Sequence, residues 1–198
     1  MSHPGPMQVN PVILNGQVVR MEPLDEQHLD GLCEVGLDPA LWEFAAGPVL
    51  TREKMKDYLQ VALEEACEGR SLPFATVLQA EDRVVGCTRF GNIALNHRTL
   101  EIGWTWIGVD WQRTAVNSEA KLLLLQHAFE SLGAHRVELK TDSRNQRSQN
   151  AIRRIGATYE GTFRKHMILN DGRRRDTVWF SITDEEWPEV RSRLQQRL

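Results

Sequence analysis

A stretch near the middle of the chain has the composition of an anion-binding turn. It runs Ile107-Gly108-Val109-Asp110-Trp111-Gln112-Arg113-Thr114-Ala115-Val116-Asn117 and leads into a leucine-rich helical pattern. The first backbone N–H groups of a helix lack intrahelical partners and carry partial positive charge, which suits a pyrophosphate. Arg113 would add a charged side chain. The alternative is an ordinary strand-to-helix loop in which Asn117 or Ser118 only caps the helix.

A second stretch, Asn145-Gln146-Arg147-Ser148, follows an apolar strand pattern. An asparagine at the end of a strand can offer both a donor and an acceptor to a ligand that carries amides. Equally, Asn145 could close a turn and Ser148 could cap the next helix. Glu101, just before the first stretch, is a candidate general base, with a surface carboxylate beside Arg98 as its alternative.

The elements that must position these groups are short and mixed in type. A tight hairpin is predicted around Asn15-Gly16, because this dipeptide suits a type I′ turn. Helix-spaced apolar residues predict helices over 23–36, 51–69, 116–131 and 148–155, and a last one from Asp184. Strands are predicted over 74–79, 84–93, 100–109, 136–141, 157–169 and 175–182. This order indicates an α/β (mixed α+β) fold rather than a simple alternation of strand and helix.

Composition favours one soluble domain over residues 1–198, with 1–10 as a flexible tail. Of 198 residues, 41% are hydrophobic, and the net charge of −3 argues against a general nucleic-acid binder. No run reaches the ~18 apolar residues of a membrane span, and the first residues lack a signal-peptide pattern. The three cysteines lack metal-ligand spacing and indicate reduced thiols in a cytoplasmic protein. We therefore expect no metal, no membrane and no nucleic acid as partners.

The order and spacing of several stretches resemble the GNAT superfamily of acetyl-CoA-dependent N-acetyltransferases, and within it the RimJ/RimL-like branch of ribosomal-protein-alanine acetyltransferases. These stretches cover nearly the whole chain: Gly16–Leu24, Glu101–Trp104, Gln112–Leu125, Arg136–Thr141, Asn145 with Ser148, and Arg154–Gly161. The resemblance implies the GNAT fold, in which a central, mostly antiparallel sheet splays at strands 4 and 5 and carries helices on both faces.

The resemblance also implies roles for individual residues, with acetyl-CoA as co-substrate and coenzyme A as its product. The backbone of Ile107, Gly108 and Val109 would pair with the pantetheine arm, and the N–H near Val109 is our candidate oxyanion donor. Asn145 would hydrogen-bond the pantetheine, and Ser148 would lie near the thioester sulfur. The pyrophosphate would be held by the loop Gln112, Arg113, Thr114, Ala115, Val116 and Asn117.

Two positions depart from the family pattern. Ala115 stands where the phosphate loop usually has glycine, and its Cβ makes a positive φ costly, so it either has a negative φ or weakens the loop. Ile152 stands where many members have a tyrosine that protonates the leaving thiolate. Ser148 or a water must then replace that acid, or no dedicated acid exists. Both departures keep open a non-catalytic acyl-CoA-binding or sensing domain.

The acceptor is an amine in the transferase interpretation. A peptide α-amine, with a pKa near ~8, is roughly a tenth neutral at pH 7, whereas a lysine near ~10.4 is neutral about once in 2,500. A peptide or protein α-amine therefore fits best, and a small-molecule amine is the alternative. Family members form the acceptor cleft from the first two helices and the last hairpin, where Trp42 could line it. An exposed hairpin edge is compatible with a homodimer.

The segment from Arg136 to Arg175 is strongly basic, with eleven Lys and Arg against four Asp and Glu. A solvated basic face and a surface for a polyanionic ligand both explain such an excess. In the acetyltransferase interpretation Arg153 and Arg154 could face the adenosine phosphates. The run Arg173-Arg174-Arg175 is interpreted as a solvated edge, with acceptor binding as the alternative.

Overall fold

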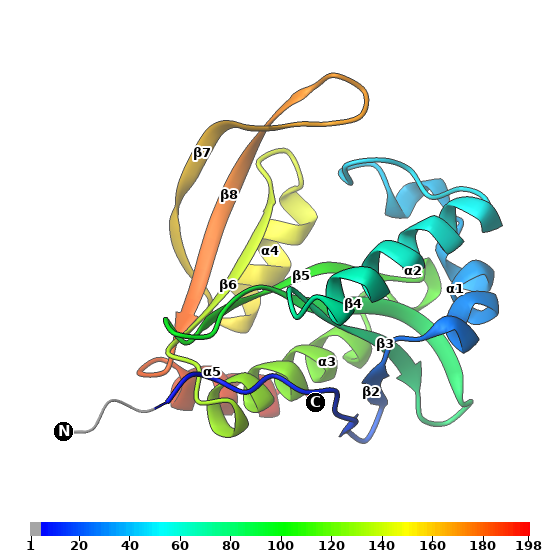
Figure 1. Ribbon diagram of the computed structural model, residues 1–198. Helices are drawn as coiled ribbons and strands as arrows, with labels where there is room; N and C mark the ends of the chain where they lie inside the picture. Colours follow the sequence, from blue (N-terminus) through cyan, green and yellow to red (C-terminus); the bar gives the residue numbers. More distant parts are fainter. Residues whose placement is uncertain (1–4) are drawn as a thin grey trace.

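The computed structural model describes residues 5–198, and one eight-stranded sheet forms its centre (Figure 1). The strand order is β1-β2-β3-β4-β5-β6-β8-β7. Neighbouring strands are antiparallel except β5 and β6, which are parallel. The predicted mixed, mostly antiparallel sheet is therefore confirmed. The strands are β1 (Leu14–Asn15), β2 (Val19–Pro23), β3 (Leu72–Leu78), β4 (Arg83–Ala94), β5 (Thr99–Ile107), β6 (Arg136–Asp142), β7 (Thr158–Ile168) and β8 (Arg174–Thr183).

Helices cover both faces of the sheet, as expected. In Figure 1, α1 and α2 lie on one side, and α3 and α5 lie on the other. A buried apolar cluster fills each interface, one around Leu32 and Met55 and a larger one around Leu124 and Phe180. Burial of each such side chain contributes about 1.5–3 kcal/mol. The helices are α1 (Leu29–Gly36), α2 (Arg52–Cys67), α3 (Ala115–Gln126), α4 (Gln146–Ile155) and α5 (Trp187–Gln195).

Strands β6 and β8 place apolar and polar side chains on opposite faces. Leu139 of β6 and Phe180 of β8 belong to the larger cluster, beneath α3, α4 and α5. Because side chains alternate along a strand, Lys140 and Trp179 point to the other face. On that face α1 and α2 pack mainly on β3, β4 and β5. The polar side of β6 and β8 therefore lies beside these helices and not beneath them.

The leucine-rich helix begins and ends differently from the prediction of 116–131. It starts at Ala115 and is capped by Thr114, whose hydroxyl accepts the Val116 N–H, so a cap at Asn117 or Ser118 is wrong. Its α-helical part ends at Gln126 and continues as a π-helical turn, His127–Ser131. The helix predicted over 23–36 is shorter, because Pro23 ends β2, residues Glu26–His28 form a 3₁₀ turn and α1 starts at Leu29. The remaining predicted elements are present with ends shifted by a few residues, as for α5, which starts at Trp187 and not at Asp184.

The first hairpin turns two residues later than the predicted turn at Asn15-Gly16, because the Gly16 N–H donates to the Val19 carbonyl at 2.9 Å and leaves Gln17 and Val18 as the turn. Asn15 is a strand residue paired with Arg20, so it does not occupy a turn position. The reason is the carboxylate of Glu119 on α3, which accepts N–H groups from Gln17, Val18 and Val19 at 2.8, 2.7 and 2.7 Å. The turn residues surround this carboxylate and direct their N–H groups toward it. The start of the sheet is thereby tied to α3.

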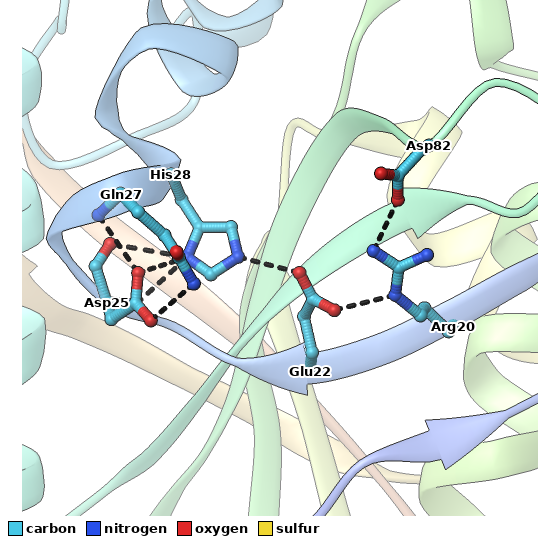
Figure 2. Close-up of polar contacts among 6 residues, drawn as sticks. All are labelled: Arg20, Glu22, Asp25, Gln27, His28 and Asp82. Carbon is cyan, nitrogen blue, oxygen red and sulfur yellow. Dashed lines mark hydrogen bonds and ion pairs between the residues drawn. The ribbon is translucent and has the colours of Figure 1, made fainter.

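A polar network joins β2 to the start of α1 and to the β3–β4 turn (Figure 2). His28, which is buried, contacts Glu22 through Nε2 and Oε1 at 2.9 Å. Arg20 donates to Glu22 at 2.6 Å and to Asp82 at 2.5 Å. Asp25 caps the 3₁₀ turn Glu26–His28 that precedes α1. The network fixes the direction in which α1 leaves the sheet.

The N-terminal segment packs against the domain from Gly5 onward. Met7 is buried and its N–H donates to the Leu95 carbonyl at 3.2 Å, and Arg98 donates to the Gly5 carbonyl. The described part of the predicted tail 1–10 thus makes defined contacts, and residues 1–4 lie outside the description. Among residues 5–198, no helix is long and apolar enough to cross a membrane. The three cysteines are free thiols.

Candidate functional site

The sheet opens between β5 and β6. These parallel strands pair only from Thr99 to Glu101 and from Arg136 to Glu138, although β5 runs on to Ile107 and β6 to Asp142. The splay predicted at strands 4 and 5 therefore lies between β5 and β6, which are the fourth and fifth strands when the two-residue strand β1 is not counted. In mixed α/β sheets, ligands bind outside the carboxyl ends of parallel strands, where the following helices begin. Here α3 follows β5 and α4 follows β6, so two helix N-termini stand at the opening.

The loop that precedes α3 has one residue with a left-handed backbone. Arg113 has a φ of +63°, whereas Ala115 is the first helical residue and has a negative φ. The Cβ of Ala115 is therefore accommodated without strain, and the costly conformation falls on Arg113. Gln112 donates to the Ile107 carbonyl at 3.0 Å and accepts from Arg147 of α4 at 3.1 Å. The first and second sequence stretches are thus in direct contact.

Most backbone groups expected to meet a ligand at 107–109 have partners within the chain. The Gly108 N–H donates to the Val85 carbonyl at 2.8 Å, and the Ile107 carbonyl accepts from Gln112. The carbonyls of Gly108 and Val109 accept from Trp111 and Gln112 in the 3₁₀ turn. The Val109 N–H has no hydrogen bond among the described residues. That N–H is therefore the group of this segment that a ligand could pair with.

Asn145 and Ser148 form a helix cap. The Oδ1 atom of Asn145 accepts the Ser148 N–H at 2.9 Å, so Asn145 caps α4 and Ser148 does not. This bond leaves the Nδ2 group of Asn145 for other partners. Ile152, one turn further along α4, is buried in the larger apolar cluster. Its position is part of the core and carries no acid.

Glu101 is almost fully buried at the point where β5 and β6 separate, with 2% of its surface exposed. Its Oε2 atom accepts from Asn92 at 2.5 Å and from Lys140 at 2.8 Å. Its Oε1 atom lies over Gly103, where a Cβ would approach it to 2.6 Å. The alternative of a surface carboxylate beside Arg98 is wrong, because the Arg98 guanidinium binds the carbonyls of Leu132 and Gly133.

Next to Glu101, cations and aromatic rings form a continuous floor. The Lys140 ammonium lies 5.0 Å from the Trp179 ring centre and 5.9 Å from that of Trp104. Arg89, which is paired with Glu65, lies over Trp104 and Tyr58. A β-bulge opposite Thr88 turns Trp104, with a φ of +51°, outward onto this floor. A sequence pattern could not identify Lys140 and Arg89, because each meets its partners across strands.

A buried lysine lies behind the bulge. Lys121 of α3 donates to Thr105 at 2.8 Å, and Thr105 in turn contacts the hydroxyl of Thr88 at 2.7 Å. Burial lowers the pKa of Lys121 to about 7, since no carboxylate neutralises it. The leucine-rich pattern around it gave no sign of this position. The contact connects α3 to the splayed part of β5.

The loop after α1 and the tip of the last hairpin enclose a cleft of about 220 Å³. One side of the cleft is formed by residues of the loop 39–50, Trp42 among them, and the other by residues 169–171 of the hairpin. The Asn170 N–H donates to the Ala46 carbonyl at 3.1 Å and joins the two sides. The last hairpin and Trp42 were expected to line an acceptor cleft, but the other side of this cleft is the loop between α1 and α2 and not the two helices themselves. Within residues 5–198, no cluster of His, Cys, Asp and Glu could hold a metal ion.

The chain is similar to several acetyltransferases. A family model for the acetyltransferase (GNAT) domain matches residues 19–158. The uncharacterized N-acetyltransferase YnaD of Bacillus subtilis is 27% identical over 150 residues, covering 76% of this chain and 84% of that one. The [ribosomal protein uS5]-alanine N-acetyltransferase of Escherichia coli is 26% identical over 121 residues, or 61% of each chain.

Solved acetyltransferase structures share the fold over most of their length. A GCN5-related N-acetyltransferase from Brucella melitensis has a TM-score of 0.90 and 32% identity, covering 97% of this chain and 88% of that one. Mycobacterium smegmatis RimJ in complex with CoA-disulfide has a TM-score of 0.77 at 23% identity, covering 94% and 92%. At that identity, the likeness to RimJ concerns the fold.

Proposed function

Because this chain belongs to the GNAT acetyltransferase family, we propose that it transfers an acetyl group from acetyl-CoA directly to the α-amine of a peptide or protein, or to a similarly weak amine. Members of the family use acetyl-CoA, whose thioester supplies the activated acetyl group. The observation that carries the proposal is the splay between β5 and β6, with the N-termini of α3 and α4 at its opening.

The residues at the splay fit coenzyme A. The N-terminal turn of α3, residues Thr114–Asn117, offers backbone N–H groups for the pyrophosphate, and Arg113 and Arg147 add positive charge beside it. From the phosphate loop the pantetheine would run past Val109 along the β6-facing edge of β5 toward Glu101. Most of the 107–109 backbone is already paired, so the Val109 N–H is the contact that this segment would offer. Asn145 would donate from Nδ2, and Ser148 lies one helical turn from it.

Glu101 is the base we propose for the acceptor amine. Asn92 and Lys140 hold Oε2, so Oε1 is the atom that would receive the proton, directly or through a water. The Val109 N–H, our sequence candidate for the oxyanion donor, lies eight residues beyond Glu101, past the end of β5, on the order of 25 Å at about 3.3 Å per residue. The two groups therefore cannot act on one carbonyl carbon, and the Val109 N–H is a candidate for a coenzyme contact instead. Since position 152 is an isoleucine, the leaving thiolate would take its proton from Ser148 or from water. Arg153 and Arg154 remain candidates for the adenosine phosphates.

The acceptor class follows from the proton that must be removed. A single carboxylate base suits an amine with a pKa near ~8 better than a lysine near ~10.4. The E. coli relative is an alanine N-acetyltransferase of ribosomal protein uS5, and this name supports an α-amine acceptor. Faster acetylation of lysine-only peptides than of peptides with free N-termini would overturn the proposal.

Two measurements test the function. Calorimetric titration with acetyl-CoA, with adenosine as control, should give one-to-one binding for acetyl-CoA only. Release of free CoA should then depend on an added peptide amine. Binding without amine-dependent release would support the second candidate, a non-catalytic acyl-CoA sensor, which Ile152 favours. Lys54→Ala, on the exposed side of α2, is a suitable control variant for both measurements.

A further inference from the structure

Strand β8 presents Arg175, Thr177 and Trp179 in a row on the polar face of the sheet. The intervening Val178 and the following Phe180 are buried on the opposite face, which fixes the alternation. The row lies beside the catalytic candidates, because Lys140 contacts Glu101 at 2.8 Å and the Trp179 ring at 5.0 Å. A group held by this row is therefore about one side chain away from the proposed base.

The neighbouring strand β7 bends around this row. Pairing between β7 and β8 is irregular from Phe163 to Met167. Phe163 and His166 both pack on Trp179, with ring centres 5.2 and 5.9 Å apart, and His166 Nδ1 meets the Thr177 hydroxyl at 3.1 Å. A hollow of about 610 Å³ opens along residues 163–166. Two of its lining residues, Phe163 and His166, contact Trp179 and Thr177, so the hollow adjoins the row.

The row contains two buried donors that the protein does not satisfy. The Nε atom of Arg175 and the Nε1 atom of Trp179 have no hydrogen-bond partner within residues 5–198. Buried polar groups are nearly always paired, so unpaired ones require an explanation such as a missing ligand. Both groups are donors. The missing partner must therefore be an acceptor.

The nearby carboxylates are already committed to other groups. Asp142 pairs with Arg173 at 2.8 Å, Glu101 pairs with Lys140, and Asp176 accepts the Lys165 N–H at 2.6 Å. Arg175 is thus a half-buried cation without a hydrogen-bonded anion of its own among the described residues. Planar guanidinium groups bind carboxylates and phosphates in a bidentate manner. The charge and geometry both favour an anion that comes from outside the chain.

We propose that Arg175 and Trp179 bind an anionic group of the acceptor, a carboxylate or a phosphate, so that the acceptor is an amine that carries a nearby negative charge. This inference rests on the proposed function and names the acceptor's second recognition element. For a peptide acceptor, the group is an acidic or phosphorylated side chain just after the N-terminal residue. For a small acceptor, it is the molecule's own carboxylate.

Matched peptides test the inference. The natural protein should acetylate a peptide that begins Ala-Asp at least tenfold more efficiently than one that begins Ala-Asn, mainly through a lower KM. Two further measurements identify the source of the anion. The first compares a peptide that begins Ala-phosphoserine with one that begins Ala-Ser, and the second uses free aspartate as a small acceptor. Arg175→Gln should reduce the Asp/Asn ratio to about one. Arg174→Gln, which removes an exposed neighbouring charge, should retain the ratio.

The outcomes separate this inference from the proposed function. Turnover of both peptides with no difference between them, or an unchanged ratio in Arg175→Gln, would overturn the anion site and leave the transferase intact. If no peptide is acetylated, calorimetry with the acidic peptide decides: binding that Arg175→Gln abolishes supports the site, and absent binding refutes it. Trp179→Phe, which keeps the ring and removes the N–H, should raise the KM of the acidic peptide only.

Discussion

Glu101 and Lys140 form a buried ion pair where β5 and β6 separate, with 2.8 Å between Oε2 and Nζ. Lys140 also lies over Trp104 and Trp179, so the pair joins the carboxylate to the aromatic floor. Removing one partner of a buried pair leaves an uncompensated charge, which costs more than the pair contributes. The carboxylate is therefore held in one position and directs its second oxygen toward Gly103.

Glu101→Gln should lower kcat about 100-fold or more, because a positioned base contributes on the order of 10²–10⁴ to the rate. The dissociation constant of acetyl-CoA should change less than about threefold, since the proposed coenzyme contacts lie elsewhere. Steady-state kinetics and calorimetry measure the two quantities. Glu138→Gln is the matched control on β6, because Glu138 pairs with Arg136 and not with the floor. Full activity in Glu101→Gln would remove Glu101 as the base.

Local signals in the sequence indicated where the candidate site begins but not every detail of it. A helix was expected to start at the Asn145–Ser148 stretch, with Ser148 as its cap, whereas Asn145 caps α4 by accepting the Ser148 N–H. The start of α3 was missed by one residue because Thr114 competes with Asn117 and Ser118 as a cap, and propensity alone does not separate them. Local reasoning fails at the first hairpin. The Glu119 carboxylate, about 100 residues away in the sequence, accepts hydrogen bonds from the N–H groups of residues 17–19, and these bonds override the turn preference of Asn15-Gly16.

The floor beside Glu101 was not predictable, because it depends on which strands are neighbours. Lys140 meets Glu101 only through the parallel pairing of β5 with β6, and that pairing ends at Glu101 itself. Trp104 turns outward because of a bulge opposite Thr88, where it has a positive φ. Such a φ usually favours glycine, and a tryptophan at this position gives no sign of the bulge in the sequence. Sequence periodicity assigns a face to a residue, but it does not identify the residue across the strand.

Glu119→Gln should lower the free energy of unfolding by about 2–4 kcal/mol, because a carboxamide presents its own donors to N–H groups that need an acceptor. The hairpin at β1 and β2 should loosen first, since its loop surrounds the carboxylate. Urea denaturation measures the global effect, and amide hydrogen exchange at Gln17–Val19 measures the local one. Glu34→Gln, at an exposed site with an ion pair at 3.7 Å, is the control and should change stability by less than about 1 kcal/mol.

Lys121 should make the protein more stable as the pH rises above 7. Burial lowers its pKa in the folded state to about 7, from 10.5 in the unfolded chain. The unfolded state then binds more protons between these values, so the penalty is complete below pH 7 and disappears toward pH 10.5. The slope from this group is at most about 1.4 kcal/mol per pH unit. Lys121→Met should remove it, whereas a slope unchanged by the substitution would show that Lys121 is not its source.

Arg113→Gly separates charge from backbone conformation at the phosphate loop. Glycine adopts a φ of +63° without the cost of about 1–2 kcal/mol that other residues incur, but it increases the entropy of the unfolded chain. Stability should therefore stay within about 1 kcal/mol of the natural protein. The dissociation constant of acetyl-CoA should rise about tenfold through the lost charge. Arg113→Lys should restore most of the affinity, and equal affinity in all three proteins would exclude Arg113 from the phosphate site.

Asn145→Asp separates the two roles of this side chain, because aspartate keeps the oxygen that caps α4 and lacks the Nδ2 donor. Stability should stay within about 0.5 kcal/mol, since aspartate and asparagine are similar N-caps. If the amide donates to the pantetheine, the dissociation constant of acetyl-CoA should rise at least about tenfold. Asn145→Ala provides the contrast, since it should also destabilise the protein by about 1 kcal/mol. Unchanged acetyl-CoA affinity in Asn145→Asp, measured by calorimetry alongside thermal unfolding, would reduce Asn145 to a helix cap.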